Sequence, residues 1–573
     1  MFFARVKIAR MSRWGLIAIV LLGTILRGMN LETKPLWLDE VITGLFTFGQ
    51  GYSVIPRETL FSVSTSPSFF SYQGQSCSGI TDFLAEQSTH PPLFFCLTHH
   101  WLGVTQGLSF LDLSLAIQLR SLPAILGIIA IPLLYHLNRE AFSERAGLAA
   151  AGIIAVSPFA VYLAQEARQY TFLLILITVA LFALVQIIKP AKPTAIYWLL
   201  WGIANSLGCY THYFFFLSFV AQIIVLFLFF LWQSPRRLLL LLSVILGVIL
   251  SYLPWLPTLI THFSSSKTDW LPSVDLFSPI YQLLLGLLVM VVTFPVENQG
   301  TFIQILSGLT MLSFGGWLLY RVSLGYRKLL QSPATRNVTL AFSLYVCLIL
   351  LQFLVIIYVL EKNIAIAPRY NYVYYPAICA LLGASLTAKT SREKVATATE
   401  IGASRRLDLP KRKGPAATVG QSSYNFRSVW GVIAVGIISS WFVVSNLFFL
   451  KPYLPEVTAQ RFNQSSKPLL MVMAYQDEMD LALGLSYSLA VNQIRDESLT
   501  SKFIFLDRNE GYTRIWEEIR QLQLNVADVW VIGTGLKRVA FPEEIGLNNN
   551  ERTCQRDRAN YYRIGIPYQR YTC

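Results

Sequence analysis

The stretch YTFLLILITVALFALVQII, residues 170–188, decides the fold class of this chain. Its 19 residues include no charged side chain, no glycine and no proline. A helix of about 20 apolar residues crosses the ~30 Å hydrocarbon core of a bilayer. Similar apolar runs recur on both sides of this stretch. The pattern therefore predicts a polytopic α-helical membrane protein.

The composition agrees with this prediction. Of the 573 residues, 54% are hydrophobic and only 14% are charged, and the mean hydropathy is +0.50. A soluble chain of this length would be expected to form about three or four domains, but its composition overrides that expectation. The formal net charge of +14 comes from basic residues spread among short linkers between apolar runs, where they set orientation. We therefore predict no nucleic-acid partner.

Together with residues 170–188, the apolar runs predict eleven membrane spans. They lie near residues 14–29, 118–137, 146–163, 170–188, 195–210, 213–232, 237–253, 301–320, 338–358, 372–388 and 428–449. Two further apolar stretches, 92–107 and 279–294, would raise the number to thirteen if both crossed the membrane.

The distribution of basic residues argues against counting these two stretches as spans. If both crossed, Lys189, Lys192, Arg236 and Arg237 would lie outside, against the excess of basic residues in cytoplasmic loops. The first stretch is also broken by THH, and the second ends in FPVENQG. We therefore expect both to lie along the outer interface of the membrane as amphipathic or re-entrant helices.

The first span follows a basic segment. MFFARVKIARMSR carries four basic residues and no acid, and WGLIAIVLLGTIL follows it. A cleaved signal peptide remains an alternative, but no small-residue cleavage site follows the apolar stretch. We expect an uncleaved span with its basic end in the cytoplasm. On either interpretation, Asp39 lies outside.

Two loops support this orientation with opposite charge balances. Residues 389–427 hold nine lysines or arginines against three acids and are rich in small and turn-forming residues, which predicts a flexible cytoplasmic linker. Residues 30–117 hold seven acids against two basic residues, which predicts an outer loop.

Residues 451–573 have the composition of a soluble domain, and an odd number of spans places them outside. LLMVMAY, KFIFL and DVWVIG are typical of buried strands, and DEMDLALGLSYSLAVNQ and GYTRIWEEIRQLQ are typical of helices. We predict a small extracytoplasmic α/β domain after a transmembrane domain of residues 1–450. A disulfide between Cys554 and Cys573 is chemically permitted there, and the sequence leaves open whether it forms.

Several short polar motifs collect on the outer side of the predicted bundle. Ionisable groups at membrane helices are costly to place and are often functional. The motifs are WLDE, THPPLFF, QEARQY and APRYNY, and they supply Asp39, Glu40, His90, Glu166, Arg168, Arg369 and Tyr370.

Each motif also has a purely structural explanation. Asp39 and Glu40 are acids of the kind favoured at a helix start, and His90 stands in a proline-containing turn. The Arg168 side chain could extend its charge to the interface, and Arg369 could anchor the chain there. No single motif decides between these explanations and chemistry.

The ordered set of motifs resembles a known family. A first span, then DE at the start of a long outer loop, then HPPL at a juxtamembrane helix, then an acid after the third span is similar to the GT-C membrane glycosyltransferases. More narrowly, it resembles the protein O-mannosyltransferase and aminoarabinose transferase superfamily, which includes bacterial members of unknown acceptor. The resemblance is densest over residues 12–260, continues through APRYNYVYYP and fades in the C-terminal region. HPPL follows the mannosyltransferases, but their large luminal insert has no counterpart before residue 451.

The resemblance implies an inverting transfer from a sugar carried on a polyprenyl phosphate. It implies that Asp39 is the general base, that Glu40 orients Asp39 or the acceptor, and that Glu166 is the second acidic position. The departing lipid phosphate gains negative charge, so the site needs cations or fixed hydrogen-bond donors. The candidates for this role are Arg369, Tyr370, Arg168 and His90.

Two other functions stay open. A flippase or transporter for lipid-linked sugars would be expected to show repeated halves and ionisable residues near the membrane midplane, whereas here the acids lie at span ends and no repeat is found. A non-catalytic envelope assembly protein could bind its partner through residues 451–573. The sugar, the acceptor (an envelope glycan, lipid or protein) and any need for a divalent metal are not written in recognisable motifs.

Overall fold

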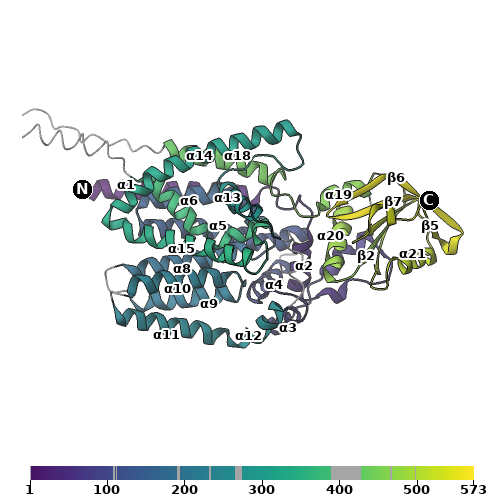
Figure 1. Ribbon diagram of the computed structural model, residues 1–573, viewed down its shortest axis with the longest axis horizontal. Helices are drawn as coiled ribbons and strands as arrows, with labels where there is room; N and C mark the ends of the chain where they lie inside the picture. Colours follow the sequence, from purple (N-terminus) through teal and green to yellow (C-terminus); the bar gives the residue numbers. More distant parts are fainter. Residues whose placement is uncertain are drawn as a thin grey trace, which may run out of the picture.

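The computed structural model describes residues 2–107, 110, 112–189, 194–231, 234–264, 274–388, 427–464, 467–496 and 498–573. It shows an elongated bundle of helices with a mixed helix and sheet unit at one end, and the two chain termini lie at opposite ends of the molecule (Figure 1). The predicted cytoplasmic linker, residues 389–427, lies outside the described residues except for its last one.

Helices form at all eleven predicted spans. The helical part consists of α1 (Phe2–Gly28), α2 (Leu38–Thr47), α3 (Cys77–Gln87), α4 (Leu93–Gln106), α5 (Leu115–Ala141), α6 (Glu144–Val156), α7 (Pro158–Ala164), α8 (Tyr170–Ile188), α9 (Ala195–Cys209), α10 (Phe215–Phe230), α11 (Pro235–Tyr252), α12 (Leu256–Phe263), α13 (Ser278–Val289), α14 (Thr301–Gln331), α15 (Pro333–Tyr358), α16 (Tyr375–Thr387) and α18 (Arg427–Val444).

The third predicted span is bent by 59° between α6 and α7. Pro158 has no N–H to continue the helical hydrogen bonds, and Ser157 caps the new helix by accepting a bond from the backbone N–H of Ala160 at 3.3 Å. The bend brings the end of α7, and with it Glu166, toward the start of α2.

Within the described residues, six helices are long and apolar enough to cross a membrane, or seven if the bent pair counts as one span. Four apolar helices are shorter, namely α9, α10, α13 and α16. The two ambiguous stretches form α4, with 14 residues, and α13, with 12 residues. Each is shorter than the ~20 residues that a crossing needs. The total of eleven spans stays a prediction.

The C-terminal unit is built on a seven-stranded sheet with the order β1-β3-β2-β4-β7-β6-β5. Its elements are β1 (Phe61–Ser62), α19 (Pro455–Phe462), β2 (Leu469–Tyr475), α20 (Glu478–Ile494), β3 (Ser501–Asp507), α21 (Tyr512–Gln521), β4 (Asp528–Gly533), β5 (Glu544–Leu547), β6 (Arg552–Ile564) and β7 (Ile566–Thr572). The three predicted strands are β2, β3 and β4, and they pair in parallel. The two predicted helices are α20 and α21.

The predicted outer loop, residues 30–117, is part of the same core as the C-terminal unit. Its strand β1 pairs with β3 at the edge of the sheet, and the ring of Phe61 stacks on that of Phe503 with centroids 5.5 Å apart. The hydroxyl of Ser486 in α20 donates to the carbonyl of Leu36 at 2.7 Å. The predicted domain boundary at residue 450 therefore divides the chain in sequence, but residues before and after it pack together in one core.

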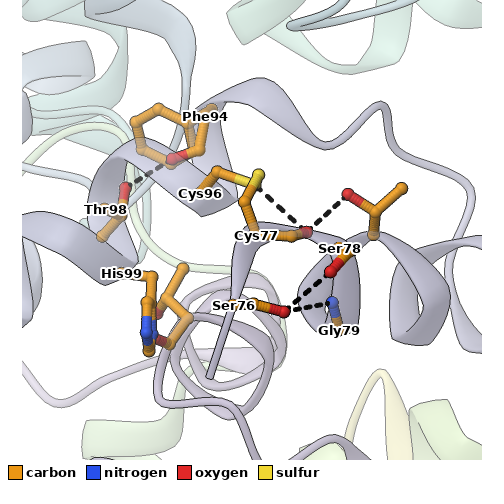
Figure 2. Close-up of a disulfide and its surroundings, with 10 residues drawn as sticks. Ser76, Cys77, Ser78, Gly79, Phe94, Cys96, Thr98 and His99 are labelled. Atoms are coloured by element: carbon orange, nitrogen blue, oxygen red, sulfur yellow. Dashed lines mark hydrogen bonds between the residues drawn. A yellow bond between two sulfur atoms is a disulfide. The ribbon is translucent and has the colours of Figure 1, made fainter. Parts of the chain in front are cut away.

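One disulfide lies within residues 30–117 and a second lies within the C-terminal unit. Cys77 and Cys96 join the start of α3 to α4 (Figure 2), and Cys554 joins β6 to Cys573 at the chain end. The sequence permitted the second pair and did not indicate the first. Beside the first pair, Ser76 caps α3 by accepting a bond from the Gly79 N–H at 3.2 Å, as Figure 2 also shows.

Candidate active site

The acidic pair at residues 39 and 40 lies in the first turn of α2. Trp37, with φ −99° and ψ 171°, is the residue that precedes the helix, and its N–H donates to Glu40 Oε2 at 3.4 Å. Acids are stabilised at this end of a helix because its free N–H groups carry partial positive charge. The two carboxylates nevertheless have different surroundings, since they point to different sides of α2.

Glu40 is completely buried, and both of its carboxylate oxygens accept hydrogen bonds. Its carboxylate receives hydrogen bonds from Arg120 Nε at 2.7 Å and Nη2 at 2.6 Å, and from the N–H of Ala167 at 2.9 Å. The Arg120 side chain, from α5, also donates to backbone carbonyls of the segment between α1 and α2. Glu40 therefore joins α2, α5 and the turn after α7, which is the geometry of a positioning residue.

Asp39 is the more open carboxylate, with 16% of its side chain exposed. Its Oδ2 atom lies 3.5 Å from Arg369 Nη2 and 3.9 Å from Arg168 Nε. These three side chains come from α2, from the turn before α8 and from the 3-10 segment Pro368–Val373 that precedes α16. The structure thus brings together a carboxylate and two guanidinium groups that are distant in sequence.

Arg168 is held in place by His90 and α2. Its Nη2 lies 2.8 Å from His90 Nε2, and its Nη1 donates to Thr43 Oγ1 at 3.0 Å. Burial and the charge of Arg168 hold the pKa of His90 well below its usual range, so the imidazole is neutral and accepts the arginine's hydrogen bond. A neutral His90 supplies no positive charge to a phosphate, and the geometry makes it a support for Arg168.

Arg369 lies between two aromatic rings. Its guanidinium carbon is 5.3 Å from the ring centre of Trp37 and 5.5 Å from that of Tyr370, whose ring in turn packs on Phe214. Its Nε atom is buried, with no hydrogen-bond partner among the described residues. Rings that hold the cation in place while a donor stays unused are suited to receiving an anionic group.

Glu166 does not join Asp39 but forms a second buried pair. Lys451 Nζ lies 2.6 Å from Glu166 Oε1, and Lys451 follows α18. The same amino group lies 5.7 Å from the ring centre of Trp37 and 5.4 Å from that of Tyr162. Trp37 thus contacts both Lys451 and Arg369.

The motifs did not identify Arg120 and Lys451, although each is a basic residue at an unusual position in the sequence. Arg120 is an ionisable residue inside an apolar span, where such groups are rare and need partners. Lys451 is a basic residue directly after a span on the predicted outer side, where the positive-inside rule disfavours it. Neither signal identifies the partner.

We expect Lys451→Met to destabilise the protein by about 3–5 kcal/mol, because it leaves the buried Glu166 carboxylate without its cation. Thermal unfolding would measure the loss, and Lys537→Met at an exposed position is the matched control. The double variant Lys451→Met/Glu166→Gln should recover part of the stability. Equal melting of Lys451→Met and wild type would show that the pair is not needed.

Within the described residues, no group of three or more His, Cys, Asp or Glu side chains is arranged to hold a metal ion.

Residues 101–260 match the family model described as dolichyl-phosphate-mannose-protein mannosyltransferase. This segment includes Arg120, Glu166 and Arg168. The match confirms the resemblance to the mannosyltransferase superfamily over these residues, and the apolar helices are those of a multi-pass membrane protein.

Among solved structures, the chain is similar to the ArnT protein of Cupriavidus metallidurans bound to undecaprenyl phosphate, at 14% identity over 90% of this chain and 92% of that one, with a TM-score of 0.49. It is also similar to the Archaeoglobus fulgidus oligosaccharyltransferase, at 13% identity over 91% and 69% of the two chains, with a TM-score of 0.42. For the S. cerevisiae Pmt1–Pmt2 complex bound to the sugar donor, identity is 15% over 48% and 36%, with a TM-score of 0.30. Because each TM-score is below 0.5, these alignments establish no shared activity. No curated protein matches the chain in sequence.

Proposed function

We propose that this protein is an inverting glycosyltransferase of the plasma membrane of a bacterium, which moves a sugar from a polyprenyl-phosphate donor to an envelope acceptor on the outer face. The observation that carries the proposal is the position of Asp39, a partly open carboxylate beside Arg369 and Arg168 at the start of the first outer loop. A base next to two cations suits a reaction that takes one proton and releases one phosphate.

In the proposed reaction, Asp39 removes the proton of an acceptor hydroxyl while that oxygen attacks the anomeric carbon of the donor sugar. The bond between this carbon and the phosphate oxygen breaks, and its electron pair leaves with the lipid phosphate. The configuration at the carbon inverts, because attack and departure occur on opposite faces. One base is sufficient, since the phosphate is a good leaving group without protonation.

The reaction also requires that the negative charge developing on the departing phosphate be stabilised. Arg369 can donate from a held guanidinium whose Nε is unused within the described residues, and Arg168 lies across Asp39 from it. Tyr370 contributes by holding Arg369. The family model's name, which includes a dolichyl phosphate, supports a lipid-phosphate donor, and the sugar stays open.

For Arg369→Ala we expect donor handling, measured as kcat/KM for the polyprenyl-phosphate sugar, to fall roughly ten- to a hundredfold, because a charge-assisted contact of about 1.5–3 kcal/mol is lost. Arg369→Lys should recover only part of this, since lysine offers a point charge and no planar fork. Arg57→Ala, at an exposed position between α2 and α3, is the control. Unchanged donor kinetics in folded Arg369→Ala would leave Arg369 as an anchor only.

The outer location of the site is supported by both disulfides, which lie in residues 30–117 and 451–573 and form in oxidising compartments. In intact cells, single cysteines at Ser64 and Gln464 should react with a membrane-impermeant maleimide, whereas one at Ser404 should react only after permeabilisation. Cys347, the exposed free cysteine, is replaced first. Reaction at Ser404 from outside would contradict the topology.

The alternatives are a flippase for lipid-linked sugars and a non-catalytic assembly protein, and no contact in the described residues favours either. The test is a transfer assay with a radiolabelled polyprenyl-phosphate sugar and envelope extract. Transfer of label to a glycan, lipid or protein supports the proposal and identifies the acceptor class. Movement of label across the membrane without transfer would instead indicate a flippase.

A further inference from the structure

A cavity of about 190 Å³ lies between the helical part and the C-terminal unit, away from Asp39. Four separate segments line it: residues 34–35 after α1, residues 297–299 before α14, residues after the end of α18, and α19 with the residue before it. Its wall includes Lys451, whose amino group is bonded to Glu166. The cavity therefore adjoins the buried pair of Lys451 and Glu166.

The polar groups of this cavity are mixed in kind. They comprise two amino groups, two carboxylates and four amides, from Lys34, Lys451, Glu297, Glu456, Asn298, Gln299, Asn446 and Gln460. A set that offers donors and acceptors in similar number fits a ligand whose groups both donate and accept. Hydroxyl groups have this property, and phosphate oxygens, which mainly accept, do not.

Several of these groups are held before any ligand arrives. Glu297 Oε2 accepts from the Leu450 N–H at 2.8 Å, and Glu456 Oε2 accepts from Asn446 Nδ2 at 2.6 Å. Asn446 Oδ1 is buried and has no hydrogen-bond partner among the described residues. Each carboxylate thus keeps one oxygen, and Asn446 an acceptor, that these internal bonds do not use.

The electrostatics of the cavity disfavour an anionic ligand. Lys34 Nζ donates to the Val443 carbonyl at 2.6 Å, and burial together with the charges of Lys451 and Arg120 lowers its pKa to about 7. Lys451 is neutralised by Glu166. Little net positive charge is left to attract an anion. The volume is below the ~300–1,000 Å³ of sites that enclose a drug-sized ligand, so it suits one ring of a longer molecule.

We propose that this cavity is a subsite for one sugar ring of a hydroxyl-rich acceptor glycan. The inference rests on the proposed function and assigns the two substrates to two places. The acceptor glycan binds in the cavity beside Lys451, the lipid phosphate binds at Arg369, and Trp37 contacts both cations. The acceptor is accordingly a glycan, and neither a protein nor a simple lipid.

The test measures binding without turnover. Wild type in lipid nanodiscs free of sugar detergents would be titrated with maltose, cellobiose and mannobiose, and separately with inorganic phosphate, using saturation-transfer NMR. We expect at least one disaccharide to bind and phosphate not to compete. Gln460→Ala should weaken binding roughly two- to tenfold, through one lost hydrogen bond. Val457→Phe should abolish it by filling the cavity.

The matched control is Gln464→Ala, at an exposed glutamine just beyond α19 that does not line the cavity, and it should bind as wild type does. Asp39→Asn should also keep sugar binding, so that a failure of the proposed catalysis and a failure of the subsite give different results. Absence of disaccharide binding by wild type, or binding unchanged in both Gln460→Ala and Val457→Phe, would overturn the subsite.

Discussion

Asp39→Asn is expected to lower the rate of sugar transfer by about 10²- to 10⁴-fold, the usual contribution of a general base. The amide has nearly the shape of the carboxylate but no basic oxygen to take the acceptor proton. Asp39→Glu should also be poor, because it moves the carboxylate by ~1 Å, and a displacement of that size can reduce a rate ~10²-fold. Turnover by the purified variants measures both effects.

The control for Asp39→Asn is Asp82→Asn, which makes the same chemical change at an exposed position of the same outer loop. It should transfer sugar as wild type does. Asp39→Asn should still unfold at a temperature near that of wild type and still bind donor, because its contacts with Arg369 and Arg168 are longer than close hydrogen bonds. Near-normal turnover of Asp39→Asn would remove Asp39 from the chemistry and leave a helix-start acid.

Arg120→Ala is expected to destabilise the protein by about 3–5 kcal/mol, because it leaves the Glu40 carboxylate buried without its cation. It also removes the donor for the carbonyls of Leu31, Lys34 and Pro35. Transfer activity should be lost with it, since the first turn of α2 is no longer fastened to α5. Thermal unfolding and yield measure the first effect, and Arg139→Ala, in the last turn of the same helix, is the control.

A double variant separates stability from positioning. Arg120→Met/Glu40→Leu removes both charges and should recover part of the stability, because an apolar pair can replace a buried ion pair. It should not recover transfer, since no side chain then ties the segment before α2 to α5 and the turn after α7. If the double variant transfers sugar at the wild-type rate, Glu40 and Arg120 do not position Asp39.

The elements that local pattern determines were predictable from the sequence. Apolar runs predicted helices at all eleven places, and LLMVMAY, KFIFL and DVWVIG predicted β2, β3 and β4. The antiparallel strands were not predicted, because β6, for example, has the polar sequence RTCQRDRANYYRI and is mostly half-buried. Strand β1 has only two residues and exists through its pairing with β3, which no local pattern encodes.

The sequence predicted which residues belong to the candidate site, but it did not predict which side chains they contact. The motifs identified Asp39, His90, Arg168, Arg369 and Tyr370, and the structure brings these five side chains into one set of neighbouring contacts. The role of each residue depends on contacts between residues that are distant in sequence, and the spacing of the motifs does not specify those contacts.

The acids show the same limit. Glu40 and Asp39 are adjacent in sequence, yet they lie on different sides of a helix, one on Arg120 and one between two other arginines. Glu166 is paired with Lys451, which is 285 residues away. A pairing over that distance follows from how the helices pack.

The most direct test of the proposed catalysis is release of free polyprenyl phosphate from a donor labelled in both its sugar and its lipid. With wild type and envelope extract, sugar transfer and lipid phosphate release should proceed at equal rates. Asp39→Asn should bind the donor and yet release neither product at a comparable rate. Equal release by Asp39→Asn and wild type would contradict the assignment of Asp39 as the general base.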